Sequence, residues 1–166
     1  MKFKIKKVKN KKILIDTNIW LFLFAPSFIP PKEDQKKIDR YDNIYNSLIE
    51  DNIFLFNSLI ISEFINRCLR IDFHSREKFK GKDFKKDYRN SPEYNEALKL
   101  TLSQVKKIYK IAKPINDNFD KYEIKNFKKN LDFNDSIILF QCLQNNLLLL
   151  TDDKDFKDYI NIYWWM

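Results

Sequence analysis

Glycine is almost absent from this sequence of 166 residues, in which Gly81 is the only one. Phosphate-binding loops and dinucleotide-binding fingerprints both need several glycines, because their backbone N–H groups must approach a phosphate closely. The sequence therefore excludes both of these nucleotide-binding motifs.

Histidine and cysteine are nearly as rare, since the chain has only His74, Cys68 and Cys142. These widely spaced residues cannot form a usual zinc site, and one histidine argues against histidine-based triads and two-histidine RNA cleavage. Both cysteines lie in apolar helical patterns, where a free thiol behaves as a small hydrophobe and gives no reason to expect an oxidising compartment. Any chemistry must come from carboxylates, lysines or hydroxyls.

Long apolar runs are missing as well. Residues 1–26 have the outline of a signal peptide, but Asp16 and Asn18 interrupt the apolar part. An acid at the centre of a membrane segment costs about 2.5–3.5 kcal/mol. No stretch approaches the roughly 20 apolar residues that a membrane helix needs. We therefore expect a soluble, cytoplasmic protein with no membrane partner.

Positive charge is present in excess, with a net charge of +8 and a pI near 9.3. Such an excess favours a polyanionic partner, nucleic acid above all. The alternative is a merely basic protein from an A/T-rich genome, in which lysine and asparagine are common throughout. The lysines of the basic lead-in, residues 1–11, are open to the same two interpretations: a grip on RNA backbone, or a solvated approach to the first strand.

Short apolar runs alternate with helical patterns along the chain. The apolar runs predict strands at 12–16, 53–58, 146–151 and 161–165, and they are continuous enough to suit a parallel sheet covered on both faces. The apolar stripes and caps predict helices over 34–51, 59–71, a long stretch after the N-cap Ser91, 119–129 and 134–145. The stripe of the helix after Ser91 comprises Leu98, Leu102, Val105, Ile108 and Tyr109. This alternation predicts one α/β domain over residues 1–166, with right-handed crossovers.

The segment 72–90 breaks the alternation, and we expect it to be a long surface loop or lid. Its cations are interleaved with Phe79, Phe84 and Tyr88, a combination that suits phosphate contact and base stacking in RNA. The alternative is that the aromatic side chains pin the loop to the core. The candidate RNA-binding cations are Arg76, Lys78, Lys80, Lys82, Lys85, Lys86 and Arg89.

Acidic residues from distant parts of the chain lie where they can meet at the carboxyl edge of the sheet, the edge at which open parallel sheets bind ligands. Asp16 ends the first strand, and Glu63 lies early in the helix after the second. Asp135 opens the helix before strand 146–151, which Asp152 and Asp153 follow.

Each acid alone has a simpler explanation. Asp16 can cap a helix that begins at Thr17, Asp132 can cap the helix at 134, and Glu63 can pair with Arg67. Converging carboxylates repel one another, however, and are tolerated only if a cation neutralises them. Hard oxygen ligands select Mg²⁺ or Mn²⁺, and an acidic pocket within a basic protein suits a metal-dependent nuclease.

Four stretches, "ILIDTNIWL", "ISEFINR", "LDFNDSIIL" and "LLLTDDKDF", resemble in order and spacing the four motifs of PIN-domain ribonucleases. The resemblance covers residues 12–160 and is greatest to the VapC-like toxins of bacterial type II toxin–antitoxin pairs. It implies a three-layer α/β/α sandwich with a mostly parallel sheet and an acidic Mg²⁺ or Mn²⁺ site. The catalytic, metal-binding residues that it implies are Asp16, Glu63, Asp135 and Asp153.

The resemblance also implies supporting roles around these acids. Thr17 and Asn18 would hold Asp16 or a phosphate by hydrogen bonds, and Asn134 would do likewise. Thr151 and Asp153 match a family pattern of threonine, any residue, aspartate. Asp152 fills the variable position, and Asp155 would assist from outside the ligand set.

The function implied is endoribonucleolytic hydrolysis of RNA phosphodiesters by metal-activated water, with RNA and a cognate antitoxin protein as partners. The alternative is a catalytically inactive PIN-like RNA-binding module. A phosphotransfer receiver or phosphatase-like domain fits less well, because "DTN" lacks the DxD spacing of the phosphatases. Trp164 and Trp165 are expected to face the core from an edge strand; the alternative is that they lie at a homodimer interface.

Overall fold

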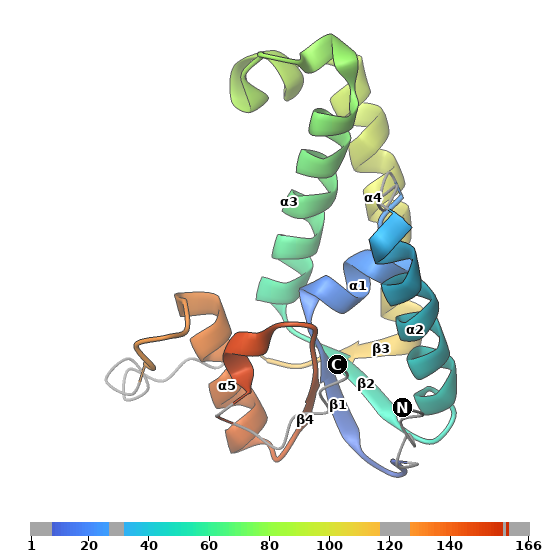
Figure 1. Ribbon diagram of the computed structural model, residues 1–166, viewed down its shortest axis with the longest axis vertical. Helices are drawn as coiled ribbons and strands as arrows, with labels where there is room; N and C mark the ends of the chain where they lie inside the picture. The colour runs from blue at the N-terminus through green and yellow to red at the C-terminus, as the bar shows by residue number, and fades with distance from the viewer. Residues whose placement is uncertain (1–7, 27–31, 117–126, 158, 160–166) are drawn as a thin grey trace.

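Four short parallel strands form the centre of the computed structural model (Figure 1), which describes residues 8–26, 32–116, 127–157 and 159. The strands are β1 (Lys12–Ile15), β2 (Ile53–Phe56), β3 (Ala112–Pro114) and β4 (Leu148–Leu150), in the order β3-β2-β1-β4. Every pairing between them is parallel, and β1 lies between β2 and β4 with Ile13 opposite Phe54 and Leu148. The fold is therefore α/β with a parallel sheet, as predicted.

Five α-helices accompany the sheet in the described part of the chain. They are α1 (Thr17–Phe24), α2 (Lys32–Leu48), α3 (Ser58–Ser75), α4 (Pro92–Ile111) and α5 (Phe133–Gln144). Figure 1 shows α2 on one side of the sheet and α5 on the other, while α3 and α4 run side by side away from it. Helices thus cover both faces of the sheet, and this is why its strands are apolar on both sides.

Burial of the strands follows from this arrangement. Ile13, Leu14 and Ile15 of β1 are all buried, and so are Leu149 and Leu150 of β4. Together with side chains from α1, α2, α3 and α5 they form one continuous hydrophobic cluster. Cys68 and Cys142 lie in this cluster as free, buried thiols, as expected from their apolar surroundings.

Strand β3 was not predicted. It has only three residues, and its sequence, Ala-Lys-Pro, has little apolar character. It pairs with β2 at one edge of the described sheet, where a proline is tolerated because its missing N–H faces no neighbour. The predicted strand 161–165 lies outside the described residues, as does most of the predicted helix 119–129. The last residues of that predicted helix, 127–129, are described and are not helical.

The predicted stripe of α4 is confirmed in part, since Val105 and Ile108 are buried and Leu98 is partly buried. The buried side chains of this helix are Ala97, Thr101, Val105 and Ile108. Leu102 and Tyr109 are instead 42% and 55% exposed. Helix α4 packs along α3 (Figure 1), and small side chains at such a contact let two helices approach closely. The half-exposed ring of Tyr109 lies instead against Phe56 of β2, with 4.6 Å between the ring centroids.

The prediction of an irregular loop over 72–90 is wrong. Residues 72–75 continue α3, and they are followed by the short helices η1 (Glu77–Phe79) and η2 (Phe84–Tyr88). A second hydrophobic cluster, made by Leu69, Phe73, Phe79, Tyr88 and Ala97, holds this segment together. We call residues 72–90 the tip, because Figure 1 shows them at the end of the α3–α4 pair that is farthest from the sheet.

Burial in the tip decides between the two interpretations of its aromatic residues. Phe79 and Tyr88 are buried, and Phe84 is half-buried against the rings of Phe73 and Tyr88. Base stacking on Phe79 or Tyr88 is therefore not available, and these rings pin the segment as the alternative supposed.

The described end of the basic lead-in, from Val8, packs against the turn before β2. The backbone N–H of Asn10 donates to the carbonyl of Asp51 at 2.7 Å. Lys9 pairs with the carboxylate of Asp51 at 3.0 Å. Residues 1–7 lie outside the described part. Among the residues that are described, no helix has the length and apolar character to span a membrane.

Candidate active site at the carboxyl edge of the sheet

Asp16 lies at the centre of the candidate site, immediately after β1. It caps α1 by accepting a hydrogen bond on Oδ1 from the backbone N–H of Thr17 at 2.6 Å. The capping explanation is therefore correct, but it uses only one of the two carboxylate oxygens. The other oxygen, Oδ2, accepts from the Asn18 amide at 2.9 Å and from the Thr151 hydroxyl at 2.5 Å.

Thr151 connects Asp16 to the segment that carries the last acid. Its hydroxyl donates to Asp16 and accepts from the backbone N–H of Asp153 at 2.9 Å. It also accepts from the Asn18 amide at 3.2 Å, while the side-chain oxygen of Asn18 accepts from the backbone N–H of Asp152 at 3.1 Å. These bonds fix the turn after β4 against the turn after β1.

Glu63 reaches the same edge from α3. Its Oε2 accepts from the Thr17 hydroxyl at 3.0 Å, and its Oε1 lies 3.4 Å from Arg67. The ion pair with Arg67 is thus present beside the contact with Thr17. Glu63 is partly exposed, with 36% of its side chain accessible to solvent.

Asp135 lies in the first turn of α5, and the helix is capped by the neighbouring Asp132. The carboxylate of Asp132 accepts from the backbone N–H of Asp135 at 2.9 Å. Because α5 runs towards the start of β4, its N-terminus lies at the carboxyl edge of the sheet. Asn134, half-buried, precedes Asp135 in the same turn.

Burial and neighbouring charges raise the pKa values of two acids of the site, Asp16 and Asp135. Burial raises the pKa of Asp16 to about 6, against the hydrogen bonds from Thr151 and Thr17 that lower it, and the charges of Glu63 and Asp153 raise it further. Burial also raises the pKa of Asp135 to about 7, with added repulsion from Asp132, Asp16, Asp153 and Glu63. The four predicted acids therefore share one electrostatic environment.

The residues after β4 separate into two groups. Asp153 caps the short helix η4 (Lys154–Phe156), where its Oδ1 accepts from the N–H of Asp155 at 2.8 Å. The side chain of Asp152 points the other way, towards α2. There it accepts a short hydrogen bond from the hydroxyl of Tyr41 and pairs with Lys37 at 3.1 Å. Asp155 is exposed and contributes its backbone to the cap.

Sequence reasoning missed a buried amide pair between α3 and α5. Asn57, fully buried after β2, donates to the side-chain oxygen of Gln141 at 2.6 Å and caps α3 through the N–H of Ile60 at 2.8 Å. Gln141 in turn donates to the carbonyl of Asn116 at 3.2 Å. An asparagine between a strand and an apolar helix start is a recognisable N-cap, so half of this pair could have been predicted.

The donor set fits a hard divalent cation in its chemistry. Asp16 is buried and Asp135 half-buried beside other acids, and a cation would neutralise the repulsion that adds to burial in raising their pKa values. Their geometry is not that of a preformed ligand set: within 8–26, 32–116, 127–157 and 159, no three His, Cys, Asp or Glu side chains already lie where they can hold one metal ion. Binding would require side-chain rotations at this edge.

Comparisons with known proteins agree with the fold. A search of curated proteins finds no match. Among solved structures, the chain is similar to one in the crystal structure of VapBC2 from Rickettsia felis bound to a DNA fragment from their promoter, with a TM-score of 0.52 and 16% sequence identity. That similarity covers 91% of this chain and 95% of the other. The family model described as PIN domain matches residues 13–161, nearly the whole sequence. This chain therefore belongs to the PIN domain family.

Proposed function

We propose that this protein is a Mg²⁺- or Mn²⁺-dependent endoribonuclease. PIN domains are generally nucleases, and the chain belongs to that family. The observation that carries the proposal is the gathering of four acids from separate segments at one edge of the sheet. Thr17 bonds both Asp16 and Glu63, and Thr151 bonds Asp16 and the backbone of Asp153. Burial, and then the charges of the neighbouring acids, raise the pKa values of Asp16 and Asp135. A stable fold does not gain from such repulsion, so a bound cation is the simplest reason for it.

The four acids are the residues that would hold the cation. When bound, Mg²⁺ or Mn²⁺ supplies a Lewis acid for the scissile phosphate and activates water as the nucleophile. The other side chains of the site position the acids. Thr151 and Asn18 fix the orientation of Asp16, and Thr17 fixes that of Glu63. Three helix N-termini, those of α1, α3 and α5, add partial positive charge at this edge.

RNA is the substrate that we propose, because the protein carries a net charge of +8 and would attract a polyanion. The candidate cations of the tip are Arg76, Lys78, Lys80, Lys82, Lys85, Lys86 and Arg89. Three of them have acidic partners: Arg76 pairs with Asp72, Lys78 with Glu93 and Lys80 with Glu77. In the described part of the chain the remaining four make no ion pair with a carboxylate.

We further propose that the protein is the toxin of a type II toxin–antitoxin pair and that it acts in the cytoplasm. The similarity in fold to the VapBC2 structure supports this role. Leu100 and Leu102, which flank the buried face of α4 on opposite sides, are 46% and 42% exposed, and either can pack against a protein partner, the antitoxin or a second copy of this chain.

A catalytically inactive RNA-binding module is the second candidate. One observation favours it: among the described residues, no three carboxylates are already arranged around a single point. On this alternative the acids would bind no cation and the basic surface would act alone. The two candidates differ in whether a divalent ion binds and whether RNA is cut.

The test is cleavage of RNA by the purified full chain with Mn²⁺, with Mg²⁺ and with EDTA. We expect divalent-dependent products in the wild type and none in Asp16→Asn, while Asp39→Asn on the exposed face of α2 serves as a matched control. Tight RNA binding in EDTA with no cutting in Mn²⁺ would support the inactive module. Equal turnover by wild type and Asp16→Asn, in preparations free of other nucleases, would refute the nuclease.

A further inference from the structure

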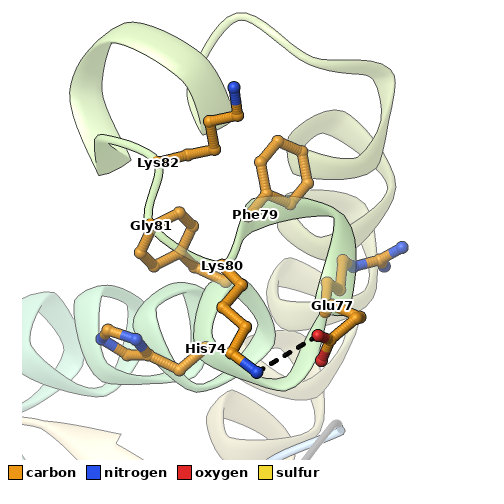
Figure 2. A pocket seen from close by; sticks show the side chains of 8 residues that line it. His74, Glu77, Phe79, Lys80, Gly81 and Lys82 are labelled. Carbon is orange, nitrogen blue, oxygen red and sulfur yellow. Dashed lines mark hydrogen bonds and ion pairs between the residues drawn. The ribbon is translucent and has the colours of Figure 1, made fainter.

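The tip contains a cavity of about 310 Å³, within the size range of sites that take a small ligand. It is lined by the rings of Phe73 and Phe79 and by the polar side chains of His74, Lys80 and Lys82, among others. Figure 2 shows Lys80 and Lys82 on either side of Gly81, with Lys80 extending towards Glu77. The turn needs this glycine, because its φ of +73° is one that L side chains rarely adopt.

The tip carries an excess of positive charge. Residues 76–90 contain seven Lys or Arg and three Asp or Glu, a net charge of +4. In the described part of the chain Lys82 has no acidic partner. Lys80 pairs with Glu77 at 3.3 Å, but both side chains are at least 79% exposed, and such surface pairs contribute little in water. Both ammonium groups are therefore available to an anion.

A buried polar network keeps the cavity in shape without a ligand. The carboxylate of Asp72, buried at the end of α3, accepts from Arg76 Nε at 2.6 Å and from the Tyr88 hydroxyl at 2.6 Å. Arg76 also lies 3.6 Å from Glu96 of α4. The network and the second hydrophobic cluster join α3, η2 and α4, so the cavity is built on fixed elements.

The cavity suits a phosphate better than a base. Phe73 and Phe79 are only 7% and 5% exposed, so neither presents a free face on which a base can stack. The polar side chains that line the cavity are four hydrogen-bond donors, His74, Arg76, Lys80 and Lys82, and one carboxylate, Glu77, which pairs with Lys80. A ribose-phosphate unit satisfies these donors and fits the volume.

The cavity is well separated from the acidic site. His74 lies eleven residues after Glu63 on α3, which corresponds to about 16 Å along the helix axis. At about 3.4 Å per stacked nucleotide, this is a reach of roughly five nucleotides. We propose that the cavity at the tip holds a backbone phosphate of the RNA substrate about five or more nucleotides from the point of cleavage. This proposal depends on the proposed function for its ligand, but on none of the acidic residues.

The test compares two double variants with the same change in net charge. Lys80→Glu with Lys82→Glu alters the rim of the cavity. Lys106→Glu with Lys110→Glu alters exposed lysines of α4 near the opposite edge of the sheet, since α4 ends where β3 begins. Each protein is assayed on one RNA in two lengths, with about ten nucleotides or about three on each side of the cut, so that only the longer reaches the tip.

We expect the wild type and the α4 variant to prefer the longer RNA, with the ratio of kcat/KM values between the two lengths well above one. In the tip variant this ratio should fall towards one through KM. The slope of log Kd against log salt for the longer RNA in EDTA should fall by about 0.7, which corresponds to one phosphate contact on a single strand. Because phosphate contacts read no sequence, RNAs of other sequences should lose affinity equally.

A tip variant that matches the α4 variant in both measurements overturns the proposal. Unchanged RNA binding with reduced affinity for polyglutamate also overturns it, because the cavity would then dock an acidic protein segment. If the wild type cuts no RNA, the proposed function fails, but the binding slopes in EDTA still decide whether the tip holds RNA phosphate.

Discussion

Replacing Asp16 with Asn should stabilise the metal-free protein at pH 8. The carboxylate of Asp16 is 6% exposed and burial raises its pKa from 3.8 to about 6, with added repulsion from Glu63 and Asp153. A folded state that raises the pKa of an acid is destabilised whenever that acid is ionised. Asparagine has nearly the same shape and carries no charge, so it removes this cost.

A rise in pKa from 3.8 to about 6 means that the ionised carboxylate costs roughly 3 kcal/mol at pH 8, since a tenfold change in an equilibrium constant corresponds to about 1.36 kcal/mol. Asparagine has its own cost. The side-chain oxygen of the asparagine must continue to accept from the N–H of Thr17, so its NH₂ group takes the place of Oδ2. In the wild type the Asn18 amide and the Thr151 hydroxyl donate to Oδ2, and an NH₂ group cannot accept these bonds. Loss of those bonds costs about 1–2 kcal/mol. The net gain is about 1–2 kcal/mol, or roughly 2–8 °C in Tm.

The difference in stability between Asp16→Asn and the wild type should depend on pH. Between the unfolded pKa of 3.8 and the folded value of about 6, the folded wild type binds more protons than the unfolded chain, so its stability falls as pH rises through this window. Asp16→Asn lacks this dependence. The advantage of the variant should therefore be full at pH 8, should disappear near pH 5, and should become a net cost of about 1–2 kcal/mol as the pH approaches 4.

The assay is urea unfolding of both proteins in EDTA at pH 5 and pH 8, repeated with Mn²⁺. Binding to the folded state alone stabilises a protein, so Mn²⁺ should raise the stability of the wild type and leave Asp16→Asn unchanged. An Asn variant that is less stable than the wild type at pH 8 in EDTA would refute the reasoning, because the carboxylate would then be favourable in the absence of metal. A control variant, Asp39→Asn, should differ little at either pH.

Three further outcomes are expected. The affinity for Mn²⁺, measured by calorimetry, should rise between pH 6 and pH 8, and binding should release protons. The reason is that the cation displaces protons from Asp16 and Asp135, whose pKa values are raised to about 6 and about 7. The Asp135→Asn variant should release fewer protons on binding. Tyr41→Phe removes the hydroxyl that holds Asp152, and it should cost about 1–3 kcal/mol in urea unfolding and weaken Mn²⁺ binding, whereas Tyr45→Phe on the same helix should do neither. Gln141→Met removes the side-chain oxygen that accepts from the amide of Asn57 and should lower the free energy of unfolding by about 1–3 kcal/mol. A Gln141→Met variant that unfolds at the same urea concentration as the wild type would contradict this.

Local sequence patterns determined the elements that carry the acids. A continuous apolar run ending in Asp16, and the run that ends at Thr151, are strands by composition alone, because only a parallel sheet covered on both faces buries such runs completely. The caps at Asp132 and Ser91 predict the starts of α5 and α4, and both use the expected side-chain oxygens. The order of these elements along the chain was enough to place Asp16, Glu63, Asp135 and Asp153 at one edge.

Tertiary structure alone decided which side chains meet across segments. Periodicity shows that one face of a helix is buried, but packing against other elements decides which face. In α4, Ala97 packs with Leu69 and Phe73 of α3, while Leu102 is exposed. The high charge of the segment 72–90 predicted a loop. In the structure its aromatic side chains pack against Leu69 and Ala97, and the segment forms the tip. Tyr41 and Lys37 of α2 bond the side chain of Asp152 on the side away from the acids. Asn57 donates a hydrogen bond to Gln141, 84 residues further along the chain. Contacts of this kind join residues far apart in the chain, and their energies depend on how the helices cross the sheet, which no local pattern records.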